Sequence, residues 1–483
     1  MASLTAGQRL FAALEIDLDA VPIEYLDDYV AIEYFLILED EPPADANNLE
    51  KVDRYLQVFN HLSEASAWQQ ASKVLSFRLE VDSKELHDQL RIWGYYYQQI
   101  ELYQGLLGKV DSEQDLVCFW GLGRIFENLS DFSKSLDYYQ QQLDLADLTK
   151  NRQAEAKAMD GIGTIQSRQQ KYLEASASHQ QQLEIAREIG DREQEGYALR
   201  GIGWVLFRHG LSQSKIREQQ AGLNYLEASL EIAHSICNLD LESESIGDIS
   251  RIYIERGQYA ESVVFLRQQL DFCEKTSNRK LRQSVLGDLG ECYTELRQYE
   301  NALECLQEAL KIAGELGDLY SEAVALNRLA VLYGYELQRY EDAIFYCEKD
   351  LEISQKLSLN QEIQIPTIIN LFNFHAFLNQ KEKADFYLKI AKSIAENSES
   401  LETKAIVVMA LANAYWSRDR IWHKLFGLFL AAKGLLMAPP WRNSNGRIAL
   451  QLTIAALTKS AKNVPIAITQ RMKKFLNKSI NHT

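Results

Sequence analysis

Proline is scarce in this chain of 483 residues. Only seven prolines occur, and none lies between residues 44 and 365. Proline lacks a backbone N–H and clashes with the preceding helical turn, so it is kept out of helix interiors. Sandwiches and barrels, by contrast, commonly place proline in their turns. The proline-free stretch of 322 residues therefore favours helices almost everywhere and argues against an all-β fold.

Signals for secretion, membrane insertion and disulfide formation are also lacking. The six cysteines form no C-x-x-C pair and no zinc spacing, so we interpret them as buried thiols in a reducing compartment. The N-terminus has one arginine followed by acids and lacks the basic-then-apolar order of a signal peptide. The longest apolar run, 425–436, is interrupted by Lys433. We expect a cytoplasmic location, with peripheral membrane contact as the alternative.

Catalytic and cofactor motifs are lacking as well. The eight histidines form no H-E-x-x-H, and the sequence contains no phosphate-binding G-x-x-x-x-G-K-[ST] and no G-x-S-x-G. Three Gly-x-Gly pairs begin at residues 121, 161 and 201, but none has the third glycine of a dinucleotide-binding turn. We interpret these pairs as close-packing positions. We therefore expect no catalytic residue, no cofactor and no metal site.

Basic charge is scarce outside the C-terminal part. Residues 1–50 contain twelve acids against Arg9, whereas residues 417–483 contain twelve bases against Asp419. The chain as a whole has a net charge of −17, which argues against general binding to a phosphate backbone. We expect a protein or peptide partner, an acidic segment among the candidates, and no nucleic acid.

What the sequence does contain is a repeat. Segments that begin at Gly121, Gly161 and Gly287 share one order of small, aromatic and leucine positions. One position, small in most units, recurs at spacings of 40, 40, 47, 40, 40, 42 and 40 residues. The residues at this position are Gly123, Gly163, Gly203, Ser250, Gly290, Ala330, Phe372 and Ala412.

Each unit has the pattern of two helices packed as a hairpin. Apolar residues at Leu286, Leu289 and Tyr293 follow the i, i+3, i+7 spacing of one helical face. The small residue allows the second helix to approach closely, and an aromatic nine residues later makes the reciprocal contact. One hairpin cannot bury both of its faces, so neighbouring hairpins stack and share a core.

These units resemble the tetratricopeptide repeat (TPR) family. The period of 40 is most similar to the repeats of kinesin light chains and spindle-orientation adaptors. The resemblance covers residues 116–435 and implies an all-α, helix–turn–helix superhelical solenoid. The third unit departs from the pattern through seven extra residues around 211–222, and the last two units have Lys381 and Ile421 in place of the aromatic.

We predict four regions: an acidic helical extension over 1–50, degenerate helical hairpins over 51–115, about eight repeats over 116–440, and a basic helical cap over 441–483. Within the cap, Ile468, Met472, Phe475 and Leu476 share one face of a short helix. Three roles stay open for it. It could cap the array, contact an anionic membrane, or bind an acidic protein such as the N-terminal region of another copy, which would make the chain an oligomer.

The resemblance also implies where a partner binds, because the first helix of each TPR hairpin lines a concave groove. The repeat phase places bases and aromatics together at the inward positions of the first three units, and asparagines in the last three. Arginine binds carboxylates through two hydrogen bonds, and asparagine can satisfy both polar groups of a peptide backbone. The candidate partner-binding residues are Trp120, Arg124, Lys157, Arg168, Tyr197, Arg200, Trp204, Phe207, Arg208, Asn327, Asn373 and Asn413.

The expected function is a non-catalytic scaffold or adaptor for protein–protein interaction. Two alternatives stay open. One is a membrane-peripheral assembly factor for a bacterial membrane complex, for example a photosynthetic one. The other is a regulator that responds to a peptide or a nucleotide.

Overall fold

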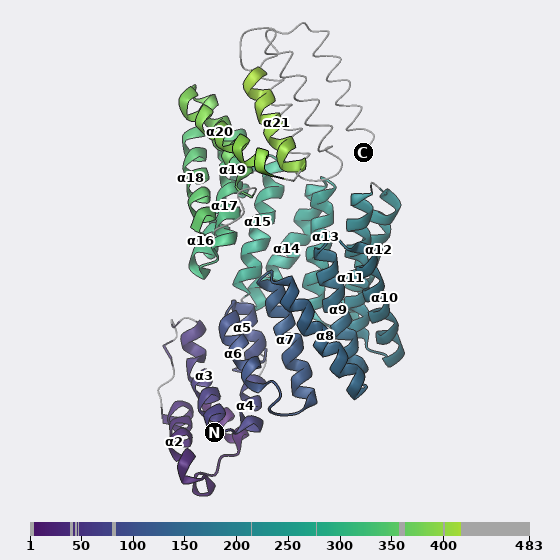
Figure 1. The fold of residues 1–483 in the computed structure, drawn as a ribbon, viewed down its shortest axis with the longest axis vertical. Coiled ribbons are helices and arrows are strands. Elements are labelled where there is room, and N and C mark those ends of the chain that lie inside the picture. The colour runs from purple at the N-terminus through teal and green to yellow at the C-terminus, as the bar shows by residue number, and fades with distance from the viewer. Residues whose placement is uncertain are drawn as a thin grey trace. The chain divides into compact units, whose positions relative to one another are not determined.

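A computed structural model describes residues 4–416, apart from 39–41, 44–45, 47, 80–83, 214, 277, 357–362 and 399–400. Within these residues, 21 α-helices follow one another along the chain (Figure 1). Extended backbone pairs there only at an isolated bridge between Arg78 and Glu85. The all-α prediction is therefore confirmed. None of the described helices combines the length and the apolar character needed to cross a membrane.

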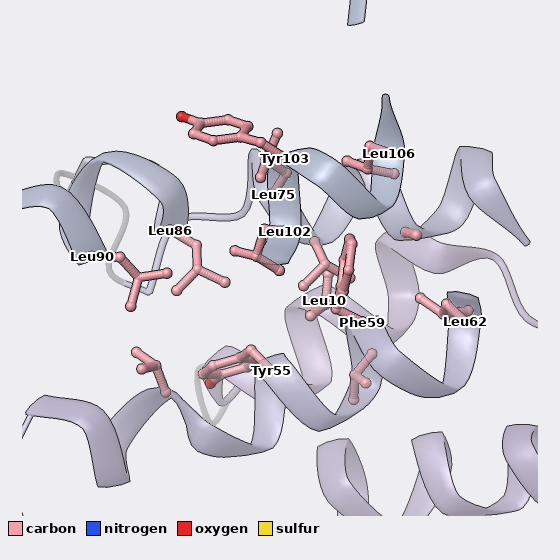
Figure 2. Close-up of a cluster of buried hydrophobic side chains, with 14 of the residues drawn as sticks. Leu10, Tyr55, Phe59, Leu62, Leu75, Leu86, Leu90, Leu102, Tyr103 and Leu106 are labelled. Carbon is pink, nitrogen blue, oxygen red and sulfur yellow. The ribbon is translucent and has the colours of Figure 1, made fainter. Parts of the chain in front are cut away.

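Apart from α3, which has 17 residues, the N-terminal helices are short. They are α1 (Ala6–Leu14), η1 (Leu18–Ala20), η2 (Ile23–Tyr25), α2 (Leu26–Glu33), η3 (Tyr34–Leu38), α3 (Asn48–Glu64), α4 (Trp68–Leu75), α5 (Leu86–Trp93) and α6 (Tyr96–Leu106). Their buried faces form one hydrophobic cluster, in which Tyr55 and Phe59 of α3 lie beneath Leu102 and Tyr103 of α6 (Figure 2). This cluster positions the first repeat, because Leu122 of the following helix belongs to it.

From residue 112 onward the helices are longer and alternate as hairpins. They are α7 (Ser112–Asn128), α8 (Phe132–Thr149), α9 (Arg152–Arg168), α10 (Tyr172–Ile189), α11 (Arg192–Ser212), α12 (Ile216–Ile236), α13 (Leu239–Glu255), α14 (Tyr259–Thr276), α15 (Arg279–Glu295), α16 (Tyr299–Leu316), α17 (Leu319–Val331), η4 (Leu332–Glu336), α18 (Tyr340–Lys356), α19 (Ile365–Phe377), α20 (Lys381–Asn397) and α21 (Leu401–Trp416).

Local sequence explains where these helices begin and turn. Asp131 caps α8 by accepting from the Lys134 N–H, and Asn151 caps α9 in the same way. Turns inside several of the hairpins contain a residue with positive φ, such as Ser130 or Gln170. The seven extra residues of the third unit extend its two helices, so α11 and α12 each span 21 residues.

The Gly-x-Gly pairs hold rings between helices. The Tyr139 ring of α8 lies against Gly123 of α7 and Gly161 of α9, and a Cβ at either glycine would come within 2.5 Å of the ring. His179 of α10 lies in the same way against Gly163 and Gly201. This confirms the interpretation of the pairs as close-packing positions.

The chain divides into two compact units. One comprises residues 1–207, 220–249 and 272–280, and the other comprises residues 208–219, 250–271 and the described residues from 281 onward. The first unit contains α1–α10 and most of α11, α12 and α13. The predicted cap at 441–483 lies outside the described residues, and the predicted region boundaries stay predictions.

Candidate functional site

Two basic side chains of the first compact unit lie over the indole ring of Trp120. Trp120 and Arg124 project from α7, and Lys157 projects from α9. The guanidinium carbon of Arg124 is 5.2 Å from the centre of the Trp120 ring, and Nζ of Lys157 is 5.8 Å from it. All three side chains are half-buried. The sequence prediction that these residues lie together is thus met by the geometry, while their role in binding stays a prediction.

Neither cation has an acidic partner at hydrogen-bond distance in the described part of the chain. Burial opposes the charge of Arg124, but the carboxylate of Glu244 and, more weakly, that of Glu127 outweigh it and raise its pKa. The guanidinium therefore stays charged while its N–H donors have no acceptor among the described side chains. A half-buried cation with unused donors is well suited to an incoming anionic group.

Two neighbouring arginines, Arg168 and Arg200, already form ion pairs within the chain. Arg200 of α11 donates from Nε to Asp248 at 2.8 Å and from Nη1 to Glu244 at 2.6 Å, both on α13. Arg168 of α9 donates to Glu127 of α7 at 3.0 Å. These bonds cross from one repeat to the next, so they hold the inner helices together. Both arginines are thus already ion-paired within the chain, and their predicted role in binding a partner stays a prediction.

The carboxyl group of Asp160 interacts with two of these arginines, Arg124 and Arg200. Burial raises the pKa of Asp160 on α9 to about 6, although the charges of Arg200 and Arg124 act against this shift. Its Oδ1 is 3.8 Å from Nδ1 of His179, a fully buried ring whose pKa burial lowers to about 4. Asp160 occupies the same repeat position as Trp120 and Arg200, three residues before the small residue. The repeat phase alone would therefore have placed it here, although the sequence prediction did not include it.

The remaining predicted partner-binding residues on α11 differ in exposure. Tyr197 and Trp204 on α11 are half-buried, and burial raises the pKa of Tyr197. Phe207 is fully buried and packs against Gly222 of α12, so it is not available to a partner. Its predicted place on the binding surface is corrected: the lengthened α11 and α12 pack there at a glycine. Arg208 is half-buried and belongs to the second compact unit.

The predicted asparagines Asn327 and Asn373 form hydrogen bonds within the second compact unit. Asn327 of α17 donates to Asp350 at 3.3 Å and to Thr367 at 3.0 Å. Asn373 of α19 is buried and donates to the Tyr335 hydroxyl at 3.0 Å. These amides satisfy polar groups between stacked hairpins, which corrects the expectation that they capture a peptide backbone. The side chain of Asn413 lies outside the described residues.

One cluster in the described part of the chain combines three residue types that bind metals. Nδ1 of His61 on α3 is 3.0 Å from Asp28 and 3.9 Å from Glu64. The shorter distance is that of a hydrogen bond, and the His61 ring also stacks on Phe35. Ordinary packing and hydrogen bonding between α2, η3 and α3 therefore explain this geometry.

Comparison with known families identifies the class of the protein. Two profiles described as tetratricopeptide repeat match residues 281–356 and 121–153. Together with the tandem helical hairpins, these matches show that the chain contains tetratricopeptide repeats. No curated protein sequence matches it.

Solved structures with a similar fold come from several kinds of protein. A signal transduction ATPase with a tetratricopeptide repeat sensor from Pyrococcus horikoshii is 17% identical, with a TM-score of 0.52, over 91% of this chain and 73% of that one. The apo quorum sensor NprR from B. thuringiensis is 14% identical, with a TM-score of 0.46, over 85% and 100%. Kinesin light chain repeats from Podospora anserina are 21% identical, with a TM-score of 0.35, over 41% and 96%. At these identities the likeness concerns the fold alone.

Proposed function

We propose that this protein is a non-catalytic scaffold that holds a carboxylate-bearing segment of a partner protein on the inner face of α7, α9 and α11. One observation carries the proposal. Arg124 and Lys157 share the Trp120 ring and have no carboxylate partner in the described residues, whereas Arg168 and Arg200 beside them are paired. A partner carboxylate would supply the missing acceptor through charge-assisted hydrogen bonds.

The surroundings of the two cations favour a protein segment over a polyanion. Glu127, Asp160 and Glu244 border them, so a chain of phosphates would meet repulsion, whereas a single carboxylate would be accepted between them. Trp120, Tyr197 and Trp204 add half-buried aromatic surface, which commonly anchors protein interfaces.

The test removes both unpaired cations. We expect Arg124→Ala/Lys157→Ala to lower partner recovery at least tenfold in a quantitative pull-down from the native cell, since anchor residues at interfaces typically contribute more than about 1 kcal/mol each. Far-UV circular dichroism of the variant checks that it keeps the helix content of the wild type.

The matched control is Lys134→Ala/Lys171→Ala, which removes two charges from the exposed beginnings of the outer helices α8 and α10. It should recover the partner as the wild type does. Equal loss in both double variants would mean that only net charge matters. Full recovery by folded Arg124→Ala/Lys157→Ala would exclude this face as the binding site.

A further inference from the structure

An exposed apolar stripe runs along α2 and its continuation η3. Val30, Tyr34 and Leu38 are 50%, 49% and 67% exposed, and Ile37 is exposed beside them. The spacing of four residues places the first three on one face of the helix. An apolar strip of this kind on a soluble protein commonly marks an interaction surface.

Packing on the opposite face fixes the orientation of the stripe. Ile32 and Leu36 are buried in the N-terminal core, and α1 crosses so closely that a Cβ at Gly7 would overlap the Leu36 carbonyl. The helix therefore cannot turn its exposed residues inward without breaking this contact. The last turn, η3, is a π-helix, a form that often occurs at functional sites.

The surroundings of the stripe are acidic. Glu24 and Asp27 are exposed at the start of the helix, and residues 1–50 contain twelve acids against one base. That base, Arg9, donates to the backbone carbonyls of Arg78 and Leu79 and so does not neutralise the acids. An occupant of this surface should therefore combine an apolar face with positive charge.

Residues 464–483 are a segment of the sequence with this combination. In residues 464–483, which lie outside the described residues, Ile468, Met472, Phe475 and Leu476 have helical spacing. The segment also carries Arg471, Lys473, Lys474 and Lys478 and has no acid.

We propose that residues 464–483 of a second copy dock on the Val30–Tyr34–Leu38 stripe, so that copies associate head to tail. The charge signs match, and both surfaces are amphipathic. A second copy is the source because hairpins of a repeat array contact mainly their sequence neighbours, so a segment after the last hairpin meets a first hairpin most directly on another molecule. Such a contact is heterologous, and each copy keeps one stripe and one segment for further copies.

Complementation between two full-length variants tests this arrangement. Tyr34→Ala/Leu38→Ala removes the stripe, and Phe475→Ala/Leu476→Ala removes the apolar face of the segment. In sedimentation velocity, the wild type should associate as concentration rises, and each variant alone should associate at least about tenfold more weakly. An equimolar mixture should form dimers and nothing larger, because one intact stripe and one intact segment remain available to each other.

Leu148→Ala/Leu173→Ala is the matched control, since both leucines are highly exposed on α8 and α10, away from the stripe. It should associate as the wild type does, and circular dichroism should show equal helix content for all variants. A monomeric wild type would overturn the proposal. So would wild-type association of either defective variant, or a mixture that fails to dimerise.

Discussion

At the scale of single residues, the inward side chains of α7, α9 and α11 show that neighbouring residues determine which contacts a charged side chain makes. Arg124 and Arg200 both occupy inward positions of the repeat. Arg200 reaches two carboxylates of α13, whereas Arg124 lies over Trp120. Arg124 therefore has no carboxylate at hydrogen-bond distance among the described residues, whereas Arg200 has two. Burial raises the pKa of Asp160 to about 6, although the charges of both arginines oppose this shift.

The raised pKa of Asp160 has a consequence for stability against pH. Its folded-state pKa of about 6 lies above the ordinary value of about 3.9, so the folded protein binds this proton more tightly than the unfolded chain does. The stabilisation is present below about pH 4 and is lost as pH rises to about 6. Asp160→Asn should therefore be more stable than the wild type at pH 7.5, by on the order of 1 kcal/mol.

Urea unfolding at pH 4 and pH 7.5 measures the difference. His179 has the opposite effect, because its lowered pKa removes stability as pH falls from about 6.5 to 4, so each comparison is made with the wild type at the same pH. Asp147→Asn, an exposed change on α8, is the control and should leave stability unchanged. A less stable Asp160→Asn at pH 7.5 would contradict the assignment.

At the scale of helices, the hairpin depends on rings that fit between glycines. The first two Gly-x-Gly pairs contact one ring from the preceding hairpin and one from their own, as Gly161 and Gly163 do with Tyr139 and His179. In the third pair Gly201 contacts the His179 ring, and Gly203 lies against the backbone of Gly222. A side chain at either glycine would separate the inner helix from its neighbour. The glycines are thus required by packing density and not by backbone conformation, because they lie within a regular helix.

Alanine substitutions separate these two requirements. Gly163→Ala places a methyl group about 2.8 Å from the His179 ring and should destabilise the protein by about 1–3 kcal/mol. Gly314→Ala in α16 meets open space and should be neutral or stabilising by up to about 1 kcal/mol, because alanine has the higher helix propensity. Thermal unfolding followed by circular dichroism measures both. Equal stability of the two variants would argue against the ring-in-glycine packing.

At the scale of the whole molecule, opposite charges lie at opposite ends of the chain. The first 50 residues and the last 67 carry equal and opposite net charges, while the repeats between them are acidic. Attraction between exposed charges is screened beyond about 10 Å at 0.1 M salt. Contacts made by the basic end should therefore be strongest at low salt, whether its partner is another copy or an anionic membrane.

Vesicle binding distinguishes these two partners. If the basic segment docks on the stripe of another copy, Tyr34→Ala/Leu38→Ala should free it and increase co-sedimentation with anionic vesicles at low salt relative to the wild type. High salt should abolish the increase because it screens the lipid charge. Neutral vesicles are the control. Equal binding by wild type and variant would mean that the basic segment does not dock on the stripe.

Much of this architecture was readable from the sequence because its causes are local. Helix periodicity, the scarcity of proline and the spacing of Gly123, Gly163 and Gly290 act within one hairpin, so they predicted an all-α repeat array and the close-packing role of the glycines. The position of Trp120 beside Arg124 also follows from helical spacing of four residues.

The tertiary structure alone decided what the inward residues contact. Arg200 is neutralised by residues 44 and 48 positions away, and Asn327 is bonded to Asp350 and Thr367 of later helices. Phe207 is buried because the extended α11 and α12 pack at Gly222. Such contacts depend on how one hairpin stacks on the next, and the repeat phase defines which way a side chain points without defining what it meets.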